Sequence, residues 1–121
     1  MINVKDKVYE ALISVCDNTT DVYPQNWETM PAIQYTEEAN TVYTKTDNEE
    51  QCSYLRYRID IWNNGSTTEL TLAVDKAISK LGLVRTECQD VTDPSYRRHK
   101  QMRYEGIIDN ETEMVYWEGN R

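Results

Sequence analysis

The stretch Gln51-Cys-Ser-Tyr-Leu-Arg-Tyr-Arg-Ile-Asp-Ile-Trp-Asn63 decides the fold of this chain. Its side chains alternate between two sets, as they would on the two faces of an extended strand. The set expected to face the core is Leu55, Tyr57, Ile59 and Ile61. The opposite set is charged and aromatic: Tyr54, Arg56, Arg58, Asp60 and Trp62. This second set has no evident cover and is a candidate contact surface.

A turn at Asn64-Gly65 follows the strand and leads into a helix that begins near Ser66. Ser66 and Glu69 have the spacing of a capping box, and Gly82 is placed to end the helix. Apolar residues recur at helical spacing between these limits: Leu70, Ala73, Val74, Ala77, Ile78 and Leu81.

The segments before the opening strand predict one helix and one hairpin. Val4, Val8 and Leu12 recur at helical spacing, which indicates an amphipathic helix over 3–16 that Asn3 can cap. The following segments are a short extended piece over 21–24, a loop over 25–30, strand residues over 31–38 and 39–43, and a polar, acidic loop over 44–50. The strand residues over 31–43 and the strand over 51–63 together predict a long hairpin.

After the second helix, the pattern predicts strands over 83–91 and 96–108 with a turn at 93–95. A turn at 109–112, a short last strand or arm at 114–117 and a tail complete the chain. The predicted fold is α+β, with an antiparallel sheet of about four main strands and two helices on one face. A chain of 121 residues predicts one domain over 1–121, in which 110–121 form a C-terminal arm.

The composition argues against several classes of function. The net charge of −8 disfavours nucleic acid or an anionic membrane as the main partner, because phosphate binding needs a basic footprint. Apolar runs are too short for a transmembrane span, and the N-terminus lacks the apolar segment of a signal peptide, so we expect a protein made and used in a cytoplasm. With 39% hydrophobic residues and a mean hydropathy of −0.78, little apolar surface is available for the core.

No pattern of catalytic or metal-ligating residues emerges from the sequence. Cys16, Cys52 and Cys88 are far apart and form no CxxC, so we expect free thiols. His99 lies among Arg and Lys, with no carboxylate pattern that would make it a general base. Asp60 with Glu87 or Glu105 could form a metal site, but such pairs arise by chance among 21 acidic residues. We therefore expect no catalytic residue, metal or cofactor.

Two charged segments remain as further candidates for an interface. The basic cluster consists of Arg97, Arg98, Lys100 and Arg103, and the acidic loop carries Asp47, Glu49 and Glu50. One interpretation is that both segments are solvated ends of strands. The other is that the acidic loop of one subunit meets the basic cluster of the next, as heterologous contacts in a ring would allow.

The order of these segments resembles the tail-completion or tail-terminator proteins of long-tailed bacteriophages and prophages. The resemblance covers nearly the whole chain and rests on patterns of order. It is carried by Val4-Lys-Asp-Lys-Val-Tyr-Glu-Ala-Leu12, Val22-Tyr-Pro24, Met30-Pro-Ala-Ile-Gln-Tyr35, Arg56-Tyr-Arg-Ile-Asp-Ile-Trp62 with the helix over 67–81, and Arg103-Tyr-Glu-Gly-Ile-Ile-Asp109.

The resemblance implies a virion protein that assembles in the host cytoplasm into a ring, usually a hexamer, on the head-proximal end of the tail tube. The ring would stop tube polymerisation and join the tail-tube protein to the head connector, without catalysis. Three alternatives remain open: another head–tail connector or neck completion protein, a small metal-dependent hydrolase or nuclease, and a cytoplasmic adaptor for one bacterial protein.

Overall fold

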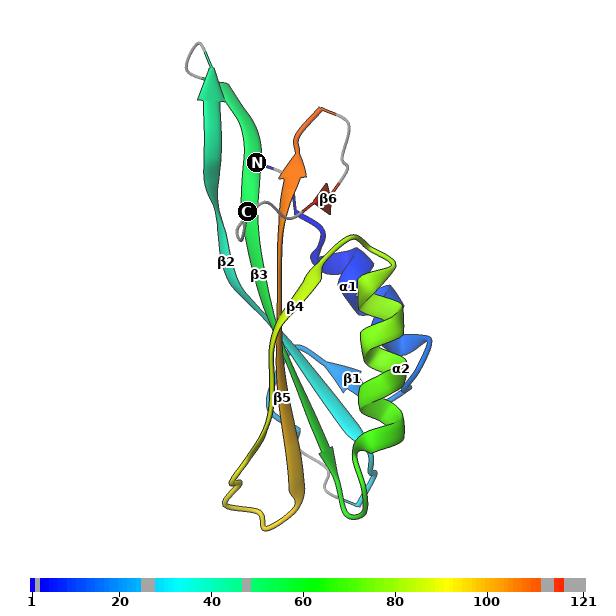
Figure 1. The fold of residues 1–121 in the computed structure, drawn as a ribbon. Helices are drawn as coiled ribbons and strands as arrows, with labels where there is room; N and C mark the ends of the chain where they lie inside the picture. The colour runs from blue at the N-terminus through cyan, green and yellow to red at the C-terminus, as the bar shows by residue number, and fades with distance from the viewer. Residues whose placement is uncertain (2, 25–27, 47–48, 112–114, 117–121) are drawn as a thin grey trace.

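The computed structural model describes residues 1, 3–24, 28–46, 49–111 and 115–116. The elements confirm the α+β class. In chain order they are α1 (Lys5–Ile13), β1 (Thr19–Thr20), β2 (Ala32–Thr46), β3 (Glu49–Asn63), α2 (Thr68–Ser79), β4 (Val84–Val91), β5 (Arg98–Asp109) and β6 (Val115–Tyr116) (Figure 1).

The sheet has the strand order β1-β2-β3-β5-β4, with β3 at its centre. The strand pairs β2–β3, β3–β5 and β4–β5 are antiparallel, but β1 pairs parallel to β2 through Thr19 and Thr20. The sheet is therefore mixed, and the prediction of a purely antiparallel sheet is wrong at this edge. β6 pairs with Ile107 and Ile108 of β5, just past Glu105, where the pairing with β4 ends.

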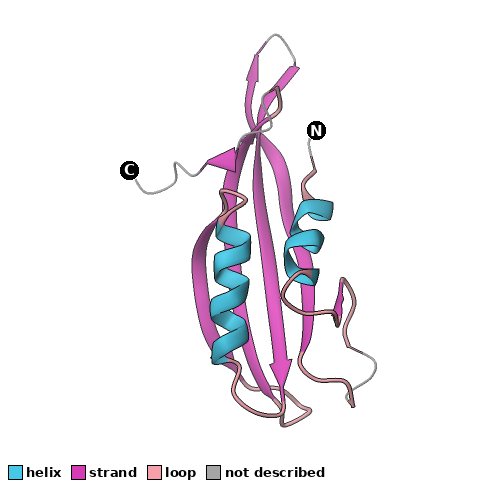
Figure 2. Cartoon of the chain, turned by 90° about the vertical axis from the view of Figure 1, so that its right-hand side faces the viewer, coloured by secondary structure: helices cyan, strands magenta, loops and turns pink. Residues whose placement is uncertain are grey.

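Both helices lie on the same side of the sheet (Figures 1 and 2). Val8 and Leu12 of α1 and Val74 and Ile78 of α2 belong to one buried cluster with the strands. The strand residues of this cluster include Ile33, Tyr35, Leu55, Tyr57, Ile59, Ile61, Met102, Tyr104 and Ile108. The expected core face of β3 is thus confirmed: its four side chains are completely buried.

The two ends of α2 differ in how well the sequence predicts them. Gly82 has a φ of 93°, a conformation that glycine adopts without steric cost, and it ends the helix as expected. The capping box is wrong. Because α2 begins at Thr68, Thr67 is the N-cap and Ser66 lies one residue too early; the Ser66 hydroxyl instead accepts a bond of 3.2 Å from the Thr68 N–H.

The N-terminal segments are shorter than the pattern predicts. α1 covers 5–13 rather than 3–16, and Asn3 accepts a hydrogen bond of 2.7 Å from the Lys5 N–H at its start. The short strand lies at 19–20 and not at 21–24. The Ile33 N–H donates to the Asn18 carbonyl at 2.9 Å. The chain therefore pairs with β2 at Thr19 and Thr20, just before the extended segment expected at 21–24.

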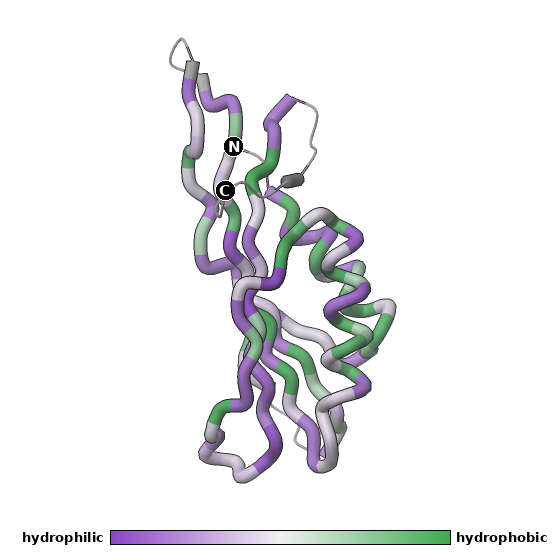
Figure 3. Tube along the Cα trace, viewed as in Figure 1, coloured by the Kyte–Doolittle hydropathy of each residue, from purple (hydrophilic) through white to green (hydrophobic). Residues whose placement is uncertain are grey.

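The β2–β3 hairpin is longer than predicted. Strand pairing continues through Lys45↔Glu50 and Thr46↔Glu49, so most of the expected acidic loop is strand. Past the helices, the hairpin carries mostly hydrophilic and neutral residues with few hydrophobic ones (Figure 3). Backbone pairing needs no buried side chain, which is why the polar sequence does not end the strands. The tip at 47–48, the Trp27 segment at 25–27 and the tail at 117–121 lie outside the described residues.

Candidate interaction surface

The sheet face opposite the helices carries a network of charged side chains, which we call the ionic face. Strand pairing aligns its members in rows across β3 and β5, because directly opposed residues share a face. These rows are Trp62↔His99, Asp60↔Gln101, Arg58↔Arg103 and Arg56↔Glu105. The ionic face therefore contains the charged and aromatic residues of β3 that the sequence marks as a candidate contact surface. It also contains residues of β5 that the sequence alone does not place beside them.

Arg103 is the centre of this network. Its Nε lies 2.9 Å from Glu38 Oε1 on β2, and its Nη1 lies 2.6 Å from Glu87 Oε2 on β4. Hydrogen bonds to Glu38 and then to Glu87 raise the pKa of Arg103, so its charge is fixed. Arg56 and Arg58 also approach Glu38, at 3.3 and 3.6 Å. The side chain of Arg103 thus connects three strands of the sheet.

Two irregularities in the strands lie next to these contacts. The β2–β3 register shifts between Glu37 and Ala39, and the β4–β5 register shifts between Arg85 and Glu87. Glu38 continues the alternation of Gln34 and Thr36 on the ionic face and reaches Arg103, whereas Glu37 accepts a hydrogen bond from Tyr57 on the helix side at 2.9 Å. The shift in β4 places Glu87 on the ionic face, opposite Arg103. Bulges commonly redirect a side chain in this way.

A second group surrounds His99 at the end of the ionic face. The His99 ring stacks on Trp62, with centroids 4.3 Å apart and planes 22° from parallel. His99 Nε2 lies 2.8 Å from Asp60 Oδ1, and Nδ1 lies 3.5 Å from Asp93 Oδ1. Trp62 Nε1 donates to the same Asp93 oxygen at 3.0 Å. The sequence contains no carboxylate pattern that points to His99, yet two aspartates lie beside it. Asp60 is brought there by the β3–β5 register, and Asp93 lies in the turn just before β5.

The electrostatics of the His99 group favour a structural role. Burial opposes ionisation of Asp60, but hydrogen bonds from His99 and Gln101 and the charge of Arg58 outweigh it, so the pKa of Asp60 lies below its ordinary value. Burial likewise opposes ionisation of Asp93, and bonds from Ser95 and Trp62 hold its pKa below its ordinary value. The His99 side chain is only 10% exposed, so a substrate has little access to either ring nitrogen.

The candidate residues of β3 differ in accessibility. Arg56 is 42% exposed and Arg58 30%, whereas Asp60 and Trp62 are each 2% exposed as whole residues. Tyr23 covers Trp62 with an edge-on ring at 5.5 Å, which the sequence does not indicate. Tyr54 donates to Glu105, and burial together with that bond raises the pKa of Tyr54 to about 12. Among the candidate residues of β3, the accessible ones are therefore Tyr54, Arg56 and Arg58.

Glu50 and the start of the basic cluster lie at opposite ends of the molecule, because β3 begins with Glu49 and Glu50 at one end and β5 begins with Arg98 at the other (Figure 1). Glu50 pairs with the N-terminal ammonium at 2.9 Å, and its pKa is lowered by that contact and by Asn110. Asp47 and the side chain of Glu49 lie outside the described residues.

Members of the basic cluster have different surroundings. Lys100 pairs with Asp90 at 2.9 Å, and Arg103 lies in mid-sheet rather than at the strand end. Arg97 is half-buried. Arg98 is exposed and makes no ion pair within the described part of the chain. Of the four, Arg98 is the residue best placed to contact a partner.

The described residues contain no group of three or more His, Cys, Asp and Glu side chains arranged to hold a metal ion. Asp60 and Glu87 do not meet; each is paired with a cation instead. Cys16, Cys52 and Cys88 carry free thiols. Among the described helices, none is long and apolar enough to cross a membrane.

No protein-family model matches this chain, and a search of curated proteins found no similar sequence.

Proposed function

We propose that this protein is a structural subunit of a bacteriophage tail, which forms a homo-oligomeric ring on the tail tube, ends its polymerisation and joins it to the head connector. The subunit is a sheet of four main strands, β2 to β5, with both helices on one face. The resemblance in segment order supports this proposal, and so does the shape of the β2–β3 hairpin.

The observation that carries the proposal is the outer part of that hairpin, residues 41–46 and 49–52, which we call the arm. It extends beyond both helices (Figure 1). Val42 and Tyr43 on the arm are 54% and 47% exposed. Two-stranded hairpins are only marginally stable in water, and exposed apolar side chains on them favour burial against a partner. An arm of this kind is expected in a subunit that assembles.

Open sheet edges provide a second reason to expect assembly. β1 pairs with β2 only at Ile33 and Gln34, so within the described residues the outer edge of β2 from 35 to 46 has no strand beside it. The outer edge of β4 is likewise unpaired within the described part of the chain. Exposed strand edges present backbone donors and acceptors to another chain.

These features suggest how the subunit would cap a tube. The arm of each subunit docks on its neighbour or on the last tube ring, and the opposite end of the subunit presents a different surface. Because that surface does not repeat the surface of the tube protein, no further tube subunit binds. A ring results when the head-to-tail contact closes on itself.

Assembly is tested by light scattering at several protein concentrations, followed by negative-stain microscopy, alone and with tail-tube subunits. We expect rings, and tubes whose length stops increasing when the protein is added. Val42→Lys should prevent assembly. Leu72→Lys is the matched control, since Leu72 is 66% exposed but lies on α2 away from the arm. The proposal fails if the protein never binds tube ends and leaves tube length unaltered.

A head–tail connector or neck completion protein is the second candidate, because the arm would serve such a ring equally well. The two functions differ in the first partner bound. Pull-down of tail-tube subunits supports the terminator, and pull-down of head-connector subunits alone supports the neck protein.

A further inference from the structure

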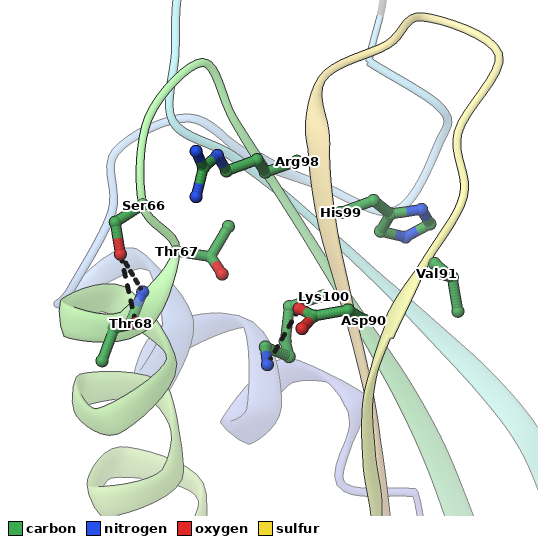
Figure 4. Close-up of a pocket in the computed structure, with 8 residues that line it drawn as sticks. All are labelled: Ser66, Thr67, Thr68, Asp90, Val91, Arg98, His99 and Lys100. Carbon is green, nitrogen blue, oxygen red and sulfur yellow. Dashed lines mark hydrogen bonds and ion pairs between the residues drawn. The ribbon is translucent and has the colours of Figure 1, made fainter.

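A cavity of about 330 Å³ lies between the start of α2 and the first residues of β5. Residues 66–68 form one wall, and Arg98, Lys100 and Asp90 form the other. The cavity is on the helix side of the sheet, so it is separate from the ionic face. In Figure 4 the His99 ring turns away from it, toward Val91, whereas Arg98 and Lys100 reach toward the helix.

The helix wall of this cavity carries hydrogen-bond donors without partners. Thr67 is the N-cap residue, yet its side chain makes no capping bond. It is 7% exposed, and its hydroxyl has no hydrogen-bond partner among the described residues. Figure 4 shows this hydroxyl directed into the space between Arg98 and Lys100. The hydroxyl oxygen itself is not fully buried, so it is open to the cavity and can donate a hydrogen bond to a ligand there.

The first turn of α2 adds backbone donors at the same wall. The Thr68 N–H donates to Ser66 Oγ at 3.2 Å, whereas the N–H groups of Glu69 and Leu70 receive no side-chain cap. Unpaired N–H groups at the start of a helix and the helix dipole together favour a bound anion.

The strand wall supplies positive charge. Arg98 and Lys100 are alternate residues of β5 and therefore share its helix-side face. Asp90 is the acidic residue of the cavity wall; its carboxylate lies 2.9 Å from Lys100 Nζ, and its side chain is 82% exposed. Two cations face one exposed carboxylate at the rim, which leaves one positive charge uncompensated. Because the Asp90 side chain is mostly in solvent, it can turn outward and release Lys100.

We propose that this cavity binds a tetrahedral oxyanion, either free phosphate or the terminal phosphate of a phosphomonoester. Arg98 and Lys100 balance its charge, and the Thr67 hydroxyl and the α2 N–H groups donate to its oxygens. The chain as a whole carries −8, which opposes a long polyanion and favours a single anionic group. This site goes beyond the proposed function, and its test requires no assembly.

The experiment is a titration of the ¹⁵N-labelled protein with inorganic phosphate, at constant ionic strength maintained with chloride. We expect saturable shifts of the Glu69 and Leu70 amide signals. Thr67→Val, which keeps the shape but loses one donor, should weaken binding about fivefold. Arg98→Gln should weaken it by about tenfold or more. Asp90→Asn should tighten it, because the competing carboxylate is gone.

Lys76→Gln is the matched control, since Lys76 is exposed in the last turn of the same helix and should bind phosphate as the unmodified protein does. A parallel titration with phenyl phosphate identifies the source: tighter binding than inorganic phosphate assigns the site to a phosphomonoester, and equal or weaker binding assigns it to free phosphate. Equal shifts with chloride alone overturn the proposal. So does unchanged phosphate affinity in Arg98→Gln, an exposed substitution that does not depend on how Thr67→Val folds.

Discussion

Arg103 joins side chains from three strands that are far apart in sequence. Glu38, Arg103 and Glu87 lie on β2, β5 and β4, and a shift in the β4–β5 register places Glu87 opposite the arginine. The Arg103 side chain is 25% exposed, so its bonds are partly shielded from water. An arginine between two carboxylates in this setting should stabilise the sheet more than an ordinary surface ion pair does.

Arg103→Gln should therefore lower the free energy of unfolding by about 1–2 kcal/mol, after allowance for its partial exposure. Urea unfolding followed by circular dichroism measures this value. Arg98→Gln on the same strand is the control and should stay within about 0.5 kcal/mol of the unmodified protein. An equal loss in the two variants would show that the Arg103 contacts add nothing.

The Asp60 and Asp93 carboxylates predict the response to acid. Their pKa values are lowered in the folded state, so each contributes stability above the ordinary carboxyl pKa of about 4 and loses it as the pH falls through the lower folded value. Stability should thus decline as the pH falls below about 4. In Asp60→Asn, urea midpoints measured from pH 7 to pH 3 should decline less steeply. An identical slope in both proteins would contradict this linkage.

At the scale of single elements, Gly82 ends α2 in a conformation that other residues adopt only with strain. Gly82→Ala should cost about 1–2 kcal/mol of unfolding free energy. Gly65→Ala is a matched control, because no atom lies within 4 Å of its added Cβ and its φ is not positive. It should be neutral, or stabilising by up to about 1 kcal/mol. Thermal unfolding of both variants tests the contrast.

The sequence predicts an element correctly when its apolar side chains recur with one regular spacing and all face the same core. β3 and the body of α2 meet this condition, because each has a single buried face. Glu87 does not, because the register shift between Arg85 and Glu87 puts its carboxylate on the face opposite to the one that a regular strand starting at Val84 gives. The pairing of His99 with Asp60 cannot be predicted from the sequence either, because it depends on the register between β3 and β5.

The partners of the buried tyrosine hydroxyls are likewise not predictable from the sequence. An aromatic content of nine Tyr, three Trp and no Phe suggests half-buried aromatic sites. Tyr57, which the strand pattern places on the core face, and Tyr104 are completely buried in the core. Their hydroxyls donate to Glu37 and Asp75, at 2.9 and 2.7 Å, and burial raises the pKa of both tyrosines. Tyrosine thus acts as core material because carboxylates at the helix side accept its hydroxyl.

At the scale of the whole molecule, the ionic face is a poor place to test assembly by charge reversal. The sequence suggests that Arg56→Glu and Arg58→Glu would spare the fold. Arg58 lies 2.9 Å from Asp60 and 3.6 Å from Glu38, so a carboxylate there would meet two others. We now expect Arg58→Glu to destabilise the monomer, whereas Arg56, the more exposed of the two, is the better probe.

Arg98→Glu should weaken self-association by about tenfold, because Arg98 is an exposed cation at the end opposite the acidic hairpin. The association of the unmodified protein should also weaken as salt rises from about 0.05 to 0.5 M. Sedimentation velocity measures both effects. Lys7→Glu, an exposed site on α1, makes the same charge change and should associate normally. Equal weakening in both variants would point to net charge rather than to this end.

The position of β5 beside β3 has a consequence for synthesis. β3 is the central strand, yet β5, one of the two strands that pair with it, comes much later in the sequence. Asn63 pairs with Arg98, 35 positions further on, and Cys52 pairs with Asp109. During translation, β2 and β3 can pair at once, but one backbone edge of β3 and the apolar side chains beside it wait for residues 98–109. A nascent chain stopped before Arg98 exposes that edge to other chains. Ribosome stalling upstream of β5 should therefore yield fragments that aggregate, whereas chains that include Asp109 can close the sheet.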